Sequence, residues 1–199
     1  MESTAELAGH HAIGIESDND FSLRINLQNN TASIEIISKE KGVTIPLNKL
    51  FPLLKFTPSR KFGFGRFSQE VFFSIPELQE NPRAIFFLLH EIGHGVVFFK
   101  LVHHDPNLLL ARNRAWAKYN TGEKMGDKEL DLILSDEREA WEMTIEMVSK
   151  IKNDFLIDMF AVFSGNVDEY VRWYTNESLC TYEADVAREK IKNEQEREV

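Results

Sequence analysis

Cysteine is nearly absent from this sequence: Cys180 is the single one among 199 residues. One cysteine cannot form an internal disulfide, so the disulfide framework of small secreted domains is excluded. The first twenty residues also lack the basic start and the apolar run of a signal peptide. We therefore expect a protein of a reducing compartment and place it in the cytoplasm.

Positive charge is also scarce, with 23 Lys and Arg against 32 Asp and Glu and a formal net charge of −9. Such a field repels phosphate backbones, so nucleic acid is not an expected partner. Long apolar runs are missing as well, because His90, Glu91 and Lys100 interrupt the best candidate before it reaches the ~20 apolar residues of a membrane helix. The sequence thus predicts a soluble protein that does not bind membranes.

Internal repeats and linkers rich in Pro, Gly or Ser are not found, so nothing divides the chain into domains. Hydrophobic residues make up 43% and charged residues 28%, which is typical of a globular protein. We predict a polar, flexible segment at residues 1–20, in which Ala12-Ile13-Gly14-Ile15 is a candidate start of a strand, and one domain at residues 21–199. His10 and His11 fall in the first segment and are interpreted as solvated side chains.

Alternation of apolar and polar residues predicts strands in the first part of the chain. Residues 21–36 alternate around the turn-forming pair Asn29–Asn30, which is typical of a β-hairpin. Residues 43–54 are apolar but contain prolines, so we expect a short helix or loop packed on the sheet. Residues 62–75 alternate again, with Phe67 on the apolar face, and give the clearest strand prediction.

The rest of the chain has a helical pattern. Asn81 is a predicted N-cap, and residues 84–101 are apolar almost all round, which indicates a helix buried in the core. Further helices are expected at residues 107–119, 127–153, 155–163, 167–174 and 176–194. The order of elements predicts an α+β fold, with an N-terminal antiparallel sheet followed by a mostly helical half.

The buried helix contains the motif His90-Glu91-Ile92-Gly93-His94. Residues four apart in a helix project within about 40° of each other, so both imidazoles can bind one cation. Glu91 lies one step round the helix, where it can act as general base on a water molecule. Burying two histidines and a glutamate without a partner would be costly, so we predict a Zn²⁺ site rather than ordinary core residues.

Two glycines interrupt this helix. Gly93 and Gly95 are poor helix formers, each costing up to about 1 kcal/mol relative to alanine. Their presence indicates that something approaches the backbone closely. We expect a second helix to pass near the motif.

A third metal ligand is expected on the helix predicted at residues 127–153. Its apolar stripe comprises Leu130, Ile133, Leu134, Trp141, Ile145, Val148 and Ile151. Glu137 falls in the middle of this stripe, whereas Asp136 lies about 100° away and Glu139 about 160° away, toward the polar face. A buried carboxylate needs a cation, so we predict Glu137 as a ligand beside the two histidines.

The motif, followed 43 residues after His94 by Glu137-x-x-Ala140 on a helix, resembles the gluzincin metallopeptidases and most closely the ImmA/IrrE-type proteases. The resemblance covers about residues 62–150. It implies a zincin-like active-site helix preceded by an edge strand, zinc held by His90, His94 and Glu137, and Glu91 as the base. The domain would then be a zincin-like metallohydrolase.

Several positions differ from related patterns. A metzincin-like site needs glycine and histidine where this chain has Val97 and Lys100, which excludes that class. Relative to the ImmA/IrrE-type proteases, Trp141 stands in place of the common asparagine, and Met143–Thr144 in place of phenylalanine and alanine. Members of that family act on repressor-like proteins.

The resemblance implies hydrolysis of peptide bonds by a zinc-activated water. The implied substrate is a polypeptide, for example a regulatory protein. One alternative is a metal-binding regulatory or inactive peptidase-like protein that acts by protein recognition. Another is a hydrolase of a different amide or ester.

A residue that stabilises the oxyanion is also required. His103 and His104 are candidates because they follow the metal helix. Weaker candidates are Tyr119, Tyr170, Tyr174, Tyr182 and Arg112. The tryptophans Trp116, Trp141 and Trp173 occupy helical positions and are expected in the core.

Overall fold

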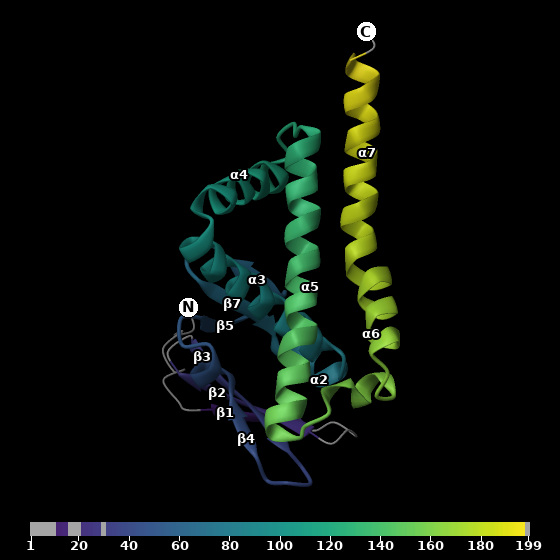
Figure 1. The fold of residues 1–199 in the computed structure, drawn as a ribbon. Helices are drawn as coiled ribbons and strands as arrows, with labels where there is room; N and C mark the ends of the chain where they lie inside the picture. Colours follow the sequence, from purple (N-terminus) through teal and green to yellow (C-terminus); the bar gives the residue numbers. More distant parts are fainter. Residues whose placement is uncertain (1–10, 16–20, 29–30, 198–199) are drawn as a thin grey trace, which may run out of the picture.

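The N-terminal part of the chain forms a four-stranded antiparallel sheet (Figure 1). The computed structural model describes residues 11–15, 21–28 and 31–197. The strands, in their order across the sheet, are β1 (His11–Ile15), β2 (Phe21–Gln28), β3 (Thr31–Ser38) and β4 (Thr44–Pro46). Ile25 is the partner of Ile34, and both are completely buried, which confirms the predicted hairpin. Its turn, Asn29–Asn30, lies outside the described residues.

The N-terminal segment contains more structure than its polar composition suggests. Strand β1 lies within residues 1–20 and includes Ala12–Ile15, the candidate start of a strand, so residues 11–15 belong to the sheet. His10 and the side chain of His11 lie outside the described part of the chain. Residues 43–54, predicted as a short helix or loop, form β4 and the one-turn helix α1 (Leu47–Leu50).

A second sheet has three short strands in the order β5-β7-β6. These are β5 (Lys55–Ser59), β6 (Gly63–Gly65) and β7 (Glu70–Ser74), with β5 parallel and β6 antiparallel to β7. The prediction of one strand over residues 62–75 is wrong at its centre. Gln69 adopts φ 56°, and its N–H donates to the carbonyl of Gly65 at 2.7 Å, which closes a turn. Phe67 lies in this turn and is 95% exposed, so its predicted place on the apolar face of a strand is wrong.

The remainder is helical, which confirms the α+β fold. The elements are α2 (Ile75–Glu80), α3 (Ala84–His104), α4 (Pro106–Thr121), α5 (Asp127–Phe155), the 3₁₀ helix η1 (Met159–Phe163), α6 (Val167–Tyr174), the π-helix η2 (Thr175–Leu179) and α7 (Cys180–Arg197). Asn81 does not cap α3 directly, because its Oδ1 accepts the N–H of Arg83 in a turn before the helix. The helix predicted at residues 155–163 is wrong in its first half, since Leu156 adopts a left-handed φ of 59° and ends α5.

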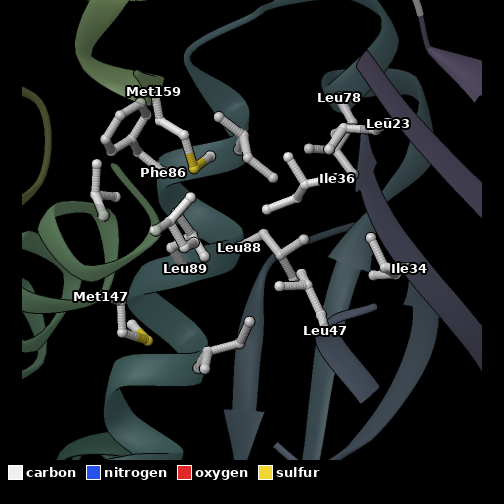
Figure 2. Close-up of a cluster of buried hydrophobic side chains, with 14 of the residues drawn as sticks. Leu23, Ile34, Ile36, Leu47, Leu78, Phe86, Leu88, Leu89, Met147 and Met159 are labelled. Carbon is white, nitrogen blue, oxygen red and sulfur yellow. The ribbon is translucent and has the colours of Figure 1, made fainter. Parts of the chain in front are cut away.

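Helix α3 is the centre of the hydrophobic core. On one side Leu88 points toward Leu47 of α1 and Ile34 of the N-terminal sheet, and on the other Phe86 lies next to Met159 (Figure 2). Among the described helices, α3 alone is long and apolar enough to cross a membrane, and 67% of its most apolar window is buried inside the protein. Because α3 is packed on both sides, its apolar composition is that of a core helix.

Helix α5 occupies a junction between helices. It contacts α3, α4 and α7, and α7 runs beside the N-terminal half of α5 (Figure 1). A side chain on α5 can therefore meet groups from three other helices. This arrangement positions the site described next.

Candidate metal centre

The two histidines of the motif and Glu137 come together between α3 and α5. The Nε2 atoms of His90 and His94 are 3.1 Å apart. Glu137 Oε2 lies 3.2 Å from His90 Nε2, and its Oε1 lies 3.2 Å from His94 Nε2. All three residues are buried, and their ligand atoms lie within 4.8 Å of one another. Such a group can hold a metal ion.

Gly93 explains how α5 approaches α3 so closely. A Cβ atom at this position would lie 2.5 Å from the backbone carbonyl oxygen of Ala140. Ala140 follows Glu137 by about one helical turn, so this backbone contact fixes the distance at which Glu137 meets the histidines. The second helix predicted near the motif is therefore confirmed at Gly93. At Gly95 a Cβ atom would instead meet the side chain of Leu54, at 2.7 Å.

We expect Gly93→Ala to lower the free energy of unfolding by about 1–3 kcal/mol, because the added methyl group meets a backbone that cannot move without separating the helices. This loss exceeds the gain of up to about 1 kcal/mol in helix propensity. Gly95→Ala is the matched control, since the flexible side chain of Leu54 can yield. Urea unfolding of the two metal-free variants measures the difference. A Gly93→Ala protein as stable as the wild type would contradict the packing described.

Asp136 is a site residue that the helical period placed wrongly. It is 1% exposed rather than turned toward the polar face, and its Oδ2 lies 3.2 Å from His94 Nδ1. Arg66, Arg112 and the indole N–H of Trp116 also donate to its carboxylate. Helix α4 supplies two of these donors, so Asp136 enters a polar cluster instead of solvent. A carboxylate on the far nitrogen of a metal-binding histidine fixes the ring and increases its basicity.

The charges around the three ligands favour a divalent cation. Four carboxylates gather here, those of Glu91, Asp136, Glu137 and Glu139, against the guanidinium groups of Arg66 and Arg112. With both histidines neutral and all four carboxylates ionised, four negative and two positive charges leave this group of described residues with a net charge of −2. Glu137 Oε2 is buried and accepts no hydrogen bond of good geometry from any described residue. Two imidazole nitrogens and a carboxylate oxygen form a donor set that suits zinc.

The buried groups also shift one another's pKa. Burial by itself would raise the pKa of Glu137, but His94 and His90 outweigh it and lower that pKa to about 2. Burial would lower the pKa of His94, but Glu137 and Asp136 outweigh it and raise that pKa to about 10. At neutral pH, therefore, His94 holds a proton and Glu137 is ionised when no cation lies between them.

This protonation predicts that zinc binding depends on pH. Because a histidine ligand must be neutral, zinc binding to the metal-free protein displaces at least the proton of His94. We expect the apparent affinity to increase about tenfold per pH unit from pH 7 toward the His94 pKa of about 10. Calorimetric titration in buffers of different ionisation enthalpy counts the released protons. Zinc binding without proton release would contradict the protonated state of His94.

Aromatic side chains pack against the histidines. The ring of Trp141 stacks on His90 with centroids 4.0 Å apart and an interplanar angle of 18°. Trp141 is completely buried, as predicted, and stacks in turn on Tyr174. Trp116 is partly buried against a second hydrophobic cluster, and it also lines a cleft and donates to Asp136.

That cleft has a volume of about 450 Å³ and is lined by the three residues of the candidate metal site. Glu91 is partly buried and lines it together with both histidines and Glu137. Burial raises the pKa of Glu91, and Glu137 adds to the effect, against the opposing influence of the two histidines. Strand β6 and the turn that follows it form one wall, while Ser178 and Tyr182, from the η2–α7 segment, also line the cleft.

Of the candidates for stabilising the oxyanion, Tyr182 alone lines this cleft. His103 and His104 are exposed at the end of α3, nine and ten residues beyond His94, roughly 14 Å along the helix. The others are engaged elsewhere: Tyr119 donates to Asp185, Tyr170 is in the core, Tyr174 stacks on Trp141, and Arg112 binds Asp136 and Glu139.

Comparisons of the chain with known protein families, with curated proteins and with solved structures find no match. What is shown is a buried group of two histidines and one glutamate that could hold a metal ion. What this group can do chemically is inferred from its two imidazole nitrogens and its carboxylate, and from the residues around them.

Proposed function

We propose that this protein is a zinc-dependent metallopeptidase of the gluzincin type. The observation that supports this best is the position of Glu91, which lines the same cleft as His90, His94 and Glu137 but is not one of the three clustered ligands. A zinc ion bound by those three residues would supply a Lewis acid that acidifies water and polarises a carbonyl group.

Two residues of the chain would then carry out the proton transfer and stabilise the oxyanion. Glu91 accepts a proton from the attacking water and passes it to the leaving amine, since a carboxylate of raised pKa serves both steps. Burial raises the pKa of Tyr182, and the carboxylates of Glu137 and Glu91 add to the effect. The phenol therefore keeps its proton and can donate a hydrogen bond to the oxyanion.

A polypeptide substrate fits the wall of the cleft. Strand β6 lies at the edge of its sheet, with β7 on one side and no strand of the described chain on the other. An unpaired edge can bind an extended peptide through main-chain hydrogen bonds. We therefore propose polypeptides, including regulatory proteins, as the substrate class.

Elemental analysis and a cleavage assay test the proposal together. We expect about one zinc ion per chain and cleavage of an unfolded polypeptide that stops with a chelator and resumes with zinc. A protein that binds no zinc would contradict the proposal. Bound zinc without cleavage would instead support a metal-binding regulatory protein.

A further inference from the structure

We infer that the cleft selects polypeptides with a bulky apolar side chain, aromatic or large aliphatic, and that Phe67 is the residue that recognises it. This inference rests on the proposed function and names the substrate class of that site. It begins with an exposed ring. Phe67 is 95% exposed, the highest value among the exposed large hydrophobic residues, and it lines the cleft.

Single exposed apolar residues are common on protein surfaces and need no explanation by themselves. Phe67 differs because its neighbours in the cleft are also aromatic: Phe62, Phe64, Phe87, Trp116 and Tyr182. These rings are held in place by packing, as with Phe62 on Phe87 and Phe64 on Phe98, both with centroids 5.9 Å apart. An apolar side chain entering here would be covered by rings on several sides.

The turn that carries Phe67 is fixed rather than loose. The preceding residue, Arg66, pairs with buried Asp136 and lies over the ring of Trp116, 5.6 Å from its centroid. The hydrogen bond from Gln69 N–H to Gly65 closes the other side of the turn. A ring presented by a fixed backbone loses little conformational entropy on binding, which favours its use in recognition.

A further feature indicates a peptide rather than a small apolar molecule. Strand β6, whose outer edge pairs with no other strand of the described residues, directly precedes this turn. A peptide bound along that edge by main-chain hydrogen bonds would bring its side chains close to Phe67 and the other rings of the cleft.

Mapping of cleavage sites tests the inference. The zinc-loaded protein is incubated with several unfolded proteins, and the cut positions are identified by mass spectrometry. We expect Phe, Tyr, Trp, Leu or Met to be enriched at one fixed position relative to the cut. Phe67→Ala should reduce cutting at those sites by about tenfold while other sites change little, and Phe67→Leu should restore most of it.

Ile191→Ala is the control, because Ile191 is also exposed, at 57%, but does not line the cleft. A cut pattern without apolar enrichment, or one that Phe67→Ala leaves unchanged, would overturn the inference. If the wild type cuts nothing, the affinity for peptides tests the inference instead. Zinc-loaded Glu91→Gln is then titrated with labelled peptides that differ only in having Phe or Gly at one central position. Tighter binding of the Phe peptide that is lost with Phe67→Ala supports the inference while the hydrolytic function fails. Equal affinities would overturn it.

Discussion

Glu91→Gln should reduce peptide cleavage by at least about 100-fold while the protein keeps its zinc. The amide has nearly the same size and can still form hydrogen bonds, but it cannot accept a proton from water. Glu91 is not one of the three clustered ligands, so zinc stoichiometry should not change. Rates of cleavage of an unfolded polypeptide, measured at matched zinc occupancy, give the comparison.

The control for this experiment is Glu146→Gln, an exposed glutamate on α5. It removes the same charge far from the cleft and should leave the rate unchanged. A Glu91→Gln protein purified in the same way also measures any contaminating peptidase. Full activity in this variant would rule out Glu91 as the base, and zinc loss would instead indicate that Glu91 is a ligand.

Glu137→Gln should weaken zinc binding by more than about 100-fold. The neutral amide is a poor ligand, so the loss of the carboxylate leaves only His90 and His94 to hold the ion. The variant also removes the carboxylate that lies 3.2 Å from each of the two histidine Nε2 atoms. Competition with a zinc-sensitive chelating dye measures the affinity, and thermal unfolding of the metal-free form verifies that the variant is folded.

A graded series separates the ligand from its surroundings. Asp136→Asn should cost only about 10–100-fold in affinity, because Asp136 acts through His94 rather than on the ion. Glu146→Gln should have no effect. An affinity of Glu137→Gln equal to that of the wild type would refute the ligand assignment, and a larger loss for Asp136→Asn than for Glu137→Gln would exchange their roles.

The sequence by itself was sufficient to predict that His90, His94 and Glu137 lie together and that an antiparallel sheet is followed by a mostly helical half. His90 and His94 share one face because four residues make about one helical turn, and Glu137 lies in an apolar stripe whose period is visible along α5. The core strands and α3 follow from strict alternation and from a run that is apolar all round. These are local patterns, and each is contained in one segment of the chain.

Tertiary structure alone decided the features that join separate segments. Asp136 is buried because α4 and the turn after β6 bring donors to a face of α5 that its own pattern marks as polar. Phe67 is exposed because Gln69 turns the chain before β7. Tyr182 meets the cleft through a π-helix and a helix far along the sequence. Helical periodicity gives the direction of a side chain within its own helix, whereas what it meets depends on long-range packing.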